Sequence, residues 1–191
     1  MGQVMLKIFI PPSDGWNEEK EEFVEFPGQA LSLEHSLVSV SKWESKWHKP
    51  FLDSSNKTVD EVIDYVRCMT LTQNVNPEAY SFLTEDNLKQ INDYLNDPMT
   101  ATWFVENEQK RQKRSTEKVT SELIYYWMVA FNIPMECQKW HFNRLLTLIR
   151  ICEIKNEEQY GGKGAKTPKS ALINKYASLN AARRKAWNTK G

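Results

Sequence analysis

Three cysteines and three histidines are the side chains of this 191-residue chain best suited to metal binding or nucleophilic catalysis. Cys137 and His141 stand four residues apart, and Cys152 follows on the same face of the helix expected there. On a straight helix Cys152 lies about 20 Å from Cys137, whereas zinc binds its ligands at about 2.0–2.3 Å. The three side chains therefore cannot share one ion, and no CxxC or HxxxH pair supports a site elsewhere. We expect no metal site and no other cofactor.

Nucleophilic catalysis has no signature in the sequence either. No cysteine stands in a local motif of a known cysteine enzyme, and no GxSxG nucleophile elbow is present. A cysteine on an apolar helix face is typically an inert core residue. The stretch 161–164, GGKG, is similar to a phosphate-binding loop, but it lacks the GxxxxGK(S/T) pattern and follows no strand. We therefore expect a protein that is not an enzyme.

The charged residues are unevenly distributed along the chain. Lys and Arg together number 25, as do Asp and Glu, but residues 161–191 contain eight basic and no acidic residues. Residues 1–160 hold the other 17 basic and all 25 acidic residues, a net charge of −8. A basic segment of this kind acts on something acidic, either a nucleic acid, an acidic partner or the acidic body of the same chain. Because that body would repel DNA, and no nucleic-acid-binding motif is present, nucleic acid is the third-ranked target.

The N-terminal 40 residues favour β structure. Apolar and other residues alternate over 3–10, and Pro11–Pro12 ends this predicted strand. Residues 11–20 are polar and predict a turn region, followed by a second strand over 22–26. A third strand is expected to begin near Ala30, because Leu31, Leu33, His35 and Leu37 alternate. The residues after it favour a helix that ends before Pro50.

The remainder of the chain is predicted to be helical up to residue 156. Thr58 with Glu61, and Thr84 with Asn87, have the spacing of residues that begin helices. A third helix is expected over 119–131, and a fourth is expected to begin with Pro134 at its first position and to run to Ile154. The last two have broad apolar faces, so we expect them to form an αα-hairpin at the centre of the folding core.

These elements predict an α+β, predominantly helical fold with a small N-terminal β element, a helical body and a C-terminal basic helix. We expect one domain over 1–156, with a β-rich part over 1–40 and a helical part over 41–156. Residues 157–167 are a Gly/Lys linker, and 168–191 are a basic helix and tail. The apolar stripe and basic end of that helix are the predicted partner-binding residues: Leu172, Ile173, Tyr176, Leu179, Arg183, Arg184 and Trp187.

Three stretches resemble a known family. They are residues 33–52 (LEHSLVSVSKWESKWHKPFL), 120–156 (TSELIYYWMVAFNIPMECQKWHFNRLLTLIRICEIKN) and 179–191 (LNAARRKAWNTKG). Together they are similar to a family of small tailed-bacteriophage proteins called tail assembly chaperones. The resemblance implies a non-enzymatic protein that binds the phage tape measure protein and assists assembly of the tail tube around it. Members of that family tend to be helical, so the β-rich N-terminus also leaves open a virion structural role, as a minor tail or head–tail joining protein.

The expected partners are therefore the tape measure protein or other tail proteins. Trp43, Trp47, Trp127 and Trp140 are candidates for binding hot spots, because Trp is enriched there. A homo-oligomer stays open, and we do not expect nucleic acid or a membrane to be bound. No apolar run approaches the 18 residues of a transmembrane helix, and no signal peptide is expected. An odd number of cysteines indicates a reducing compartment, here the host-cell cytoplasm during phage assembly.

Overall fold

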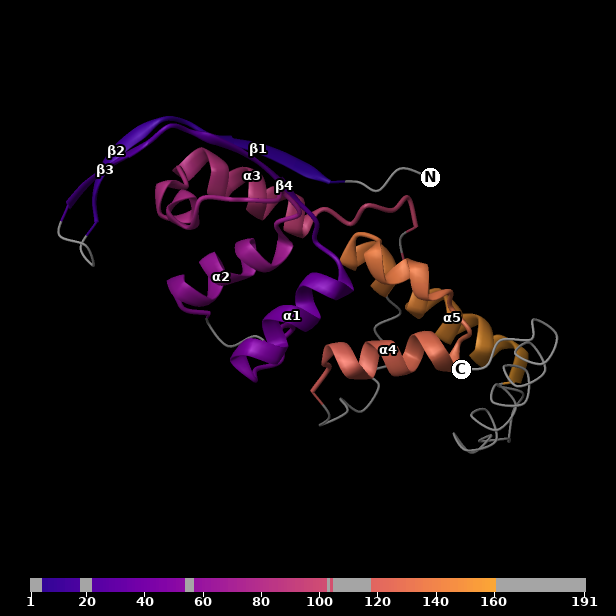
Figure 1. Cartoon of the computed structure of the whole chain (residues 1–191). Helices are drawn as coiled ribbons and strands as arrows, with labels where there is room; N and C mark the ends of the chain where they lie inside the picture. Colours follow the sequence, from indigo (N-terminus) through magenta and orange to yellow (C-terminus); the bar gives the residue numbers. More distant parts are fainter. Residues whose placement is uncertain (1–4, 18–21, 54–56, 103, 105–117, 161–191) are drawn as a thin grey trace, which may run out of the picture.

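The computed structural model describes residues 5–17, 22–53, 57–102, 104 and 118–160. It has an α+β, mostly helical fold, as the sequence predicts (Figure 1). A β ribbon formed by residues 6–17 and 22–33 lies along one side of the helices. Residues 157–160 of the predicted linker are instead the end of the last helix, Phe142–Tyr160. The rest of the linker, the predicted basic helix and its predicted binding residues lie outside the described residues.

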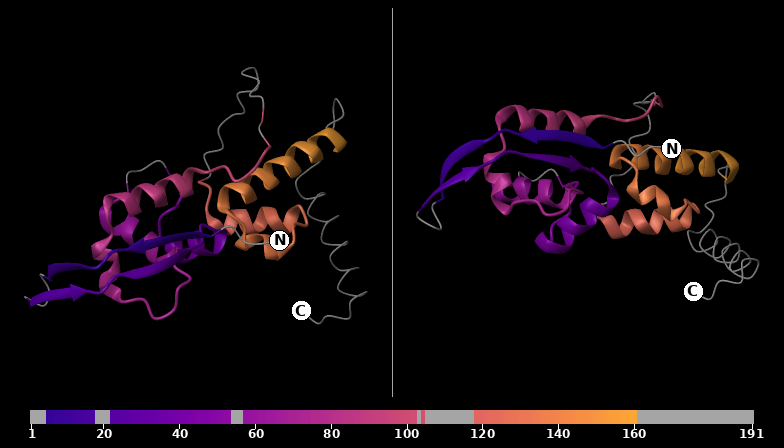
Figure 2. Two further views of the ribbon diagram at one scale, coloured as in Figure 1. Left: turned by 90° about the horizontal axis from the view of Figure 1, so that it is seen from above. Right: turned by 45° about the horizontal axis from the view of Figure 1, so that its top comes forward.

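The β ribbon contains four antiparallel strands. β1 (Leu6–Ile10) pairs with β4 (Gln29–Leu33), and β2 (Ser13–Asn17) pairs with β3 (Glu22–Phe26). Ile8 stands opposite Leu31, and both are buried against the helices, whereas Phe9 on the other face is exposed. The views in Figures 1 and 2 show the β2–β3 half of the ribbon projecting beyond the helices.

Strand β2 corrects the prediction of a turn region over residues 11–20. The sequence SDGWN has no apolar alternation, and it is extended because it pairs with all five residues of β3. An aromatic contact attaches β2 and β3 to the body. Phe82 stacks on Phe26 of β3, with ring centroids 5.0 Å apart, and also lies against Gly15 of β2. Gly15 is needed there, because a Cβ atom would lie 2.7 Å from Cε1 of Phe82.

We expect Gly15→Ala to loosen the projecting half of the ribbon. The added methyl group would push the Phe82 ring away from Phe26, which should cost about 1 kcal/mol. Backbone amides of β2 and β3 should then exchange with deuterium about fivefold faster, while the amides of the helices keep their rates. Ser13→Ala on the same strand is the control, because Ser13 is exposed and its replacement should leave the exchange rates unchanged.

The third predicted strand ends at Leu33 and does not continue to Leu37. Ser36 ends the extended segment because it caps α1 (Leu37–Trp47) in a reciprocal capping box with Ser39. The outer edge of β4 is covered by residues that follow α2 (Val59–Met69). The amide of Leu71 donates to the carbonyl of Ser32 (2.8 Å), so the sheet has no open edge on this side.

The two capping signals read from the sequence are confirmed. Thr58 and Glu61 form a capping box at the start of α2, and Thr84 and Asn87 form another at the start of α3 (Glu85–Asn96). A 3₁₀ helix, η1 (Pro77–Phe82), lies between them. The side-chain amide of Asn87 also donates to the carbonyl of Phe9 (3.1 Å), which fixes α3 on the edge of β1.

The predicted αα-hairpin is only partly correct. α4 (Ser121–Ala130) agrees with the prediction, but the segment from Pro134 is a short 3₁₀ helix, η2 (Met135–Lys139), and α5 begins only at Phe142 (Phe142–Tyr160). The chain breaks there because Trp140 is extended and the amide of Phe142 donates to the carbonyl of His35 (2.9 Å). Cys137 and His141 therefore do not share a helix.

The hydrophobic core extends over the ribbon and all the long helices and is not centred on α4 and α5 alone. Its fully buried side chains include Leu31 of β4, Trp43 of α1, Met69 of α2, Met128 of α4 and Leu145 of α5. Within the described ranges, no helix is both long enough and apolar enough to cross a membrane.

Candidate functional site

A buried chain of polar groups, His35–Tyr65–Ser39, has the residue types of a catalytic relay. Nδ1 of His35 lies 2.5 Å from Oη of Tyr65, which lies 3.2 Å from Oγ of Ser39. All three residues are buried, and their hydroxyl and imidazole groups satisfy one another inside the core. A nucleophile needs access to a substrate, which these groups do not have. The relay therefore holds the start of α1 against α2.

The protonation states agree with a structural role. Burial, and to a smaller extent the neighbouring His141 ring, lowers the pKa of His35 to about 3. Burial also raises the pKa of the Tyr65 hydroxyl far above its ordinary value. Both groups are neutral over the physiological range, so neither has the pKa near 7 that suits a general acid or base.

His141 joins this cluster from the start of α5. Its ring centroid lies 5.0 Å from that of His35, and its Nε2 lies 3.0 Å from the carbonyl oxygen of Tyr94 at the end of α3. Because a carbonyl only accepts, Nε2 carries the proton and donates it. Nδ1 is therefore an acceptor, and it is buried without a hydrogen-bond partner. Burial lowers the pKa of His141 as well.

The cysteines do not form a metal or thiolate site. Cys68, Cys137 and Cys152 are all free, and burial raises the pKa of each thiol above its ordinary value. Among the residues that the structure describes, no three His, Cys, Asp or Glu side chains are grouped closely enough to hold a metal ion.

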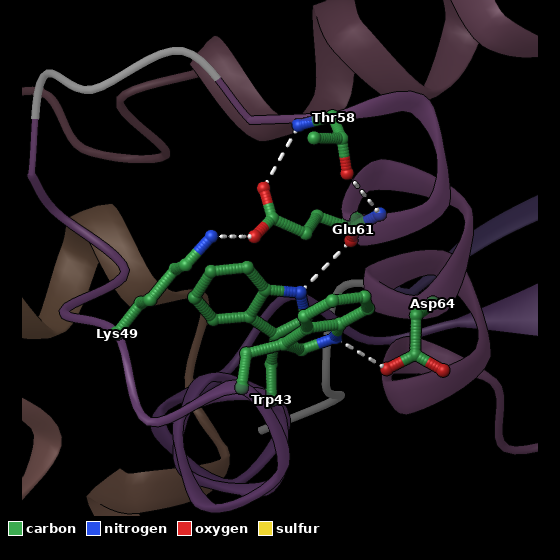
Figure 3. Close-up of polar contacts among 6 residues, drawn as sticks. Trp43, Lys49, Thr58, Glu61 and Asp64 are labelled. Carbon is green, nitrogen blue, oxygen red and sulfur yellow. Dashed lines mark hydrogen bonds and ion pairs between the residues drawn. The ribbon is translucent and has the colours of Figure 1, made fainter.

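Two buried carboxylates join α1 to α2 (Figure 3). The Nε1 group of Trp43 donates to the main-chain carbonyl of Glu61 (2.8 Å). The Glu61 carboxylate forms an ion pair with Lys49 and accepts from the main-chain amide of Thr58. One turn later, Asp64 accepts from Nε1 of Trp47 (2.9 Å) and pairs with Lys46. Two of the tryptophans expected at a binding surface therefore stabilise the helical body.

These contacts orient α2 so that part of its apolar stripe faces away from the core. Glu61 and Asp64 are 1% and 4% exposed, whereas Val59 and Val62 are 77% and 42% exposed. Val59 and Val62 share the helical spacing of Val66 and Met69, which are buried, so periodicity alone predicts burial of the two valines. Val59 and Val62 of α2 thus face outward, while Glu61 and Asp64 face the body.

The outward side of α2 forms one wall of a groove of about 420 Å³, the α2 groove. Its apolar walls come from α1, α2, η1 and the start of α3: Trp47, Val59, Ile63, Tyr80, Leu83 and Leu88. Its charged rim consists of Lys46, Asp60, Asp64 and Arg67. The guanidinium of Arg67 lies 5.1 Å from the Tyr80 ring centroid, so it shields one end of the apolar surface.

The lining of the α2 groove combines apolar walls with a charged rim. No His or Cys lines it, and its rim has equal numbers of acidic and basic residues. An apolar floor with charged edges suits the apolar face of an amphipathic segment, which inserts side chains three or four residues apart. The sequence-predicted residues from Leu172 to Trp187 lie outside the described residues, so the α2 groove is a second candidate surface that the sequence did not identify.

We compared the chain with family models, curated proteins and solved structures, and none of them matched.

Proposed function

We propose that this chain is a non-enzymatic, protein-binding assembly factor, a phage tail assembly chaperone that binds amphipathic segments of the tape measure protein. The groove supports the binding role, because Val59 of α2 and Leu88 of α3 are exposed in it and its size suits side-chain anchors. The sequence resemblance supports the choice of client. The buried, neutral His35–Tyr65–Ser39 relay supports a role without catalysis.

The proposal predicts that a charge in the α2 groove abolishes client binding. Val59→Asp should weaken binding of tape measure segments at least tenfold, because it places a carboxylate where an apolar anchor inserts. The fold should tolerate it, since Val59 is at the first position of α2, where an acidic residue favours the helix. The measurement is the soluble fraction of tape measure segments coexpressed with each variant.

Leu52→Asp is the matched control. Leu52, like Val59, is an exposed apolar side chain, but it lies in the loop after α1 and does not line the groove. It should keep the client soluble. Equal client solubility with Val59→Asp and Leu52→Asp, both folded, would exclude the α2 groove as the binding site.

A structural component of the virion is the second candidate, and the projecting β2–β3 ribbon favours it. An isolated two-stranded ribbon is only marginally stable in water, so a neighbouring subunit in an assembled tail would stabilise it. Mass spectrometry of purified particles beside infected-cell lysate distinguishes the two. A chaperone is found in the lysate and not in particles, and a structural component is found in particles at a fixed copy number.

A further inference from the structure

Helix α4 is apolar on nearly all sides, and one face of it is uncovered. Ile124 and Met128 point into the core and are fully buried. On the outward side, Tyr126 is 45% and Val129 is 52% exposed, and Met135 of η2 continues this face at 46%. A helix that is apolar all round is normally covered on every side. We call the surface formed by Tyr126, Val129 and Met135 the α4 face.

Acidic residues stand at the two ends of the α4 face. Glu122 precedes Tyr126 by one helical turn, and Glu136 follows Met135 directly, and both are exposed. The matching cover would have an apolar stripe about two turns long with basic residues beside it. Uniformly acidic or polar segments do not meet these requirements.

One segment of this chain meets them. Leu172, Ile173, Tyr176 and Leu179 have the spacing of one helical face over eight residues, and α4 is ten residues, or about 15 Å, long. The 31 residues after α5 have a net charge of +8, and residues 1–160 have a net charge of −8. Long-range attraction therefore draws this segment toward the acidic body.

The length of the linker also favours the α4 face. α5 ends at Tyr160, and seven residues then lead to Pro168, a span of at most about 25 Å. Figures 1 and 2 show α4 and α5 in the same half of the molecule, while α2 lies in the other half. A segment tethered after α5 is thus close to α4 at an effective concentration in the millimolar range.

We propose that residues 168–187 lie along the α4 face as an intramolecular helix that covers Tyr126 and Val129. The basic residues at its two ends then face Glu122 and Glu136. This contact is independent of the α2 groove and of the identity of any client. Any outside partner of α4 must first displace the chain's own segment.

Site-specific photo-crosslinking in the full chain tests this contact. A benzophenone amino acid replaces the aromatic Tyr126, and the same residue replaces Val62 of α2 as the control position. At low micromolar protein, position 126 should capture peptide 168–187 within the same chain, at least ten times more than position 62 does. Capture by a second copy, with a yield that rises with concentration, would overturn the proposal, as would no capture of this peptide.

Paired charge variants distinguish apolar docking from a charge effect. Leu172→Asp with Ile173→Asp places two carboxylates on the apolar stripe and should lower the intramolecular yield at least tenfold. Asn174→Asp with Ser178→Asp makes the same change in net charge on the opposite side of the predicted helix and should change the yield less than twofold. Equal losses with both pairs would show that charge alone draws the segment and would overturn docking on the α4 face.

Discussion

Replacement of Glu44 by alanine is expected to lower the free energy of unfolding by about 4 kcal/mol. Glu44 is buried on α1, and its two carboxylate oxygens accept from different main-chain amides. Oε1 accepts from the amide of Phe51, and Oε2 accepts from the amide of Ser121, each at 2.7 Å. Alanine would leave the buried Ser121 amide and the partly buried Phe51 amide without an acceptor, and each costs about 1–3 kcal/mol. That loss is a large share of the 5–15 kcal/mol typical of a domain.

The location of these amides makes the effect more than local. Ser121 is the first residue of α4 and is 77 residues from Glu44 in the sequence. The carboxylate therefore binds the positive end of α4 to α1, in the manner of a cap supplied from a distant helix. α4 should lose its hydrogen-exchange protection before α2 does, because α2 is held by its own contacts to Trp43 and Trp47.

Chemical denaturation of two further variants checks this explanation. Glu44→Gln keeps one acceptor oxygen but places an amide group opposite a main-chain donor, so it should cost about half as much as Glu44→Ala. Glu122→Gln is the control, because Glu122 is exposed in the first turn of the same helix, and it should cost less than about 0.5 kcal/mol. A loss below 1 kcal/mol for Glu44→Ala would contradict the bridging role.

The helix starts could be predicted from the sequence because their determinants are local. Thr58 and Glu61, like Thr84 and Asn87, satisfy amides within three residues of themselves, so their spacing is sufficient. β1 has the same advantage, since its alternation requires only one buried face. The predicted class, α+β and mostly helical, followed from these signals.

The features that the sequence did not predict depend on distant partners. β2 has no strand pattern of its own and is extended because β3 pairs with it. The break before α5 depends on the carbonyl of His35, about a hundred residues earlier. The apolar periodicity of α2 holds for Val66 and Met69 but not for Val59 and Val62, because Lys49 and Lys46 compensate the buried charges of Glu61 and Asp64. The candidate site was missed for this last reason.

The second large effect is a loss of stability in mild acid, caused by the buried histidines. His35 has a pKa of about 3 in the folded protein, against 6.5 for an unperturbed imidazole. Between these values the unfolded chain binds a proton that the folded protein does not, so stability must fall as the pH falls. At pH 5 the loss from His35 alone is about 2 kcal/mol relative to pH 7.5. His141, whose pKa burial also lowers, adds to it, although the nearby Asp97 acts in the opposite direction.

The window from about pH 4.5 to 6.5 isolates the histidines. Below this window, protonation of Glu61 also lowers stability. Its contacts with Lys49 and Thr58 hold its pKa below the ordinary 4.5, and protonation breaks these contacts. Urea denaturation at pH 5.0, 6.0 and 7.5 should therefore show a free energy of unfolding that falls as the pH falls. The double variant His35→Gln with His141→Gln should remove this slope. His48→Asn is the control: His48 is exposed at a left-handed position that Asn also adopts, so the slope should persist.

Nuclear magnetic resonance of the wild-type imidazoles gives an independent reading that does not depend on the variants folding. The ring signals of His35 should stay those of a neutral imidazole down to pH 4.5. A midpoint near 6.5 for His35 would contradict the explanation, because the folded and unfolded chains would then take up the proton together. Protonation of His35 would also place a positive charge beside Tyr65 and the ring of His141, where Tyr65 and Ser39 already satisfy one another. Acid should therefore first break the contacts of His35 that hold the start of α1 against α3 and α5.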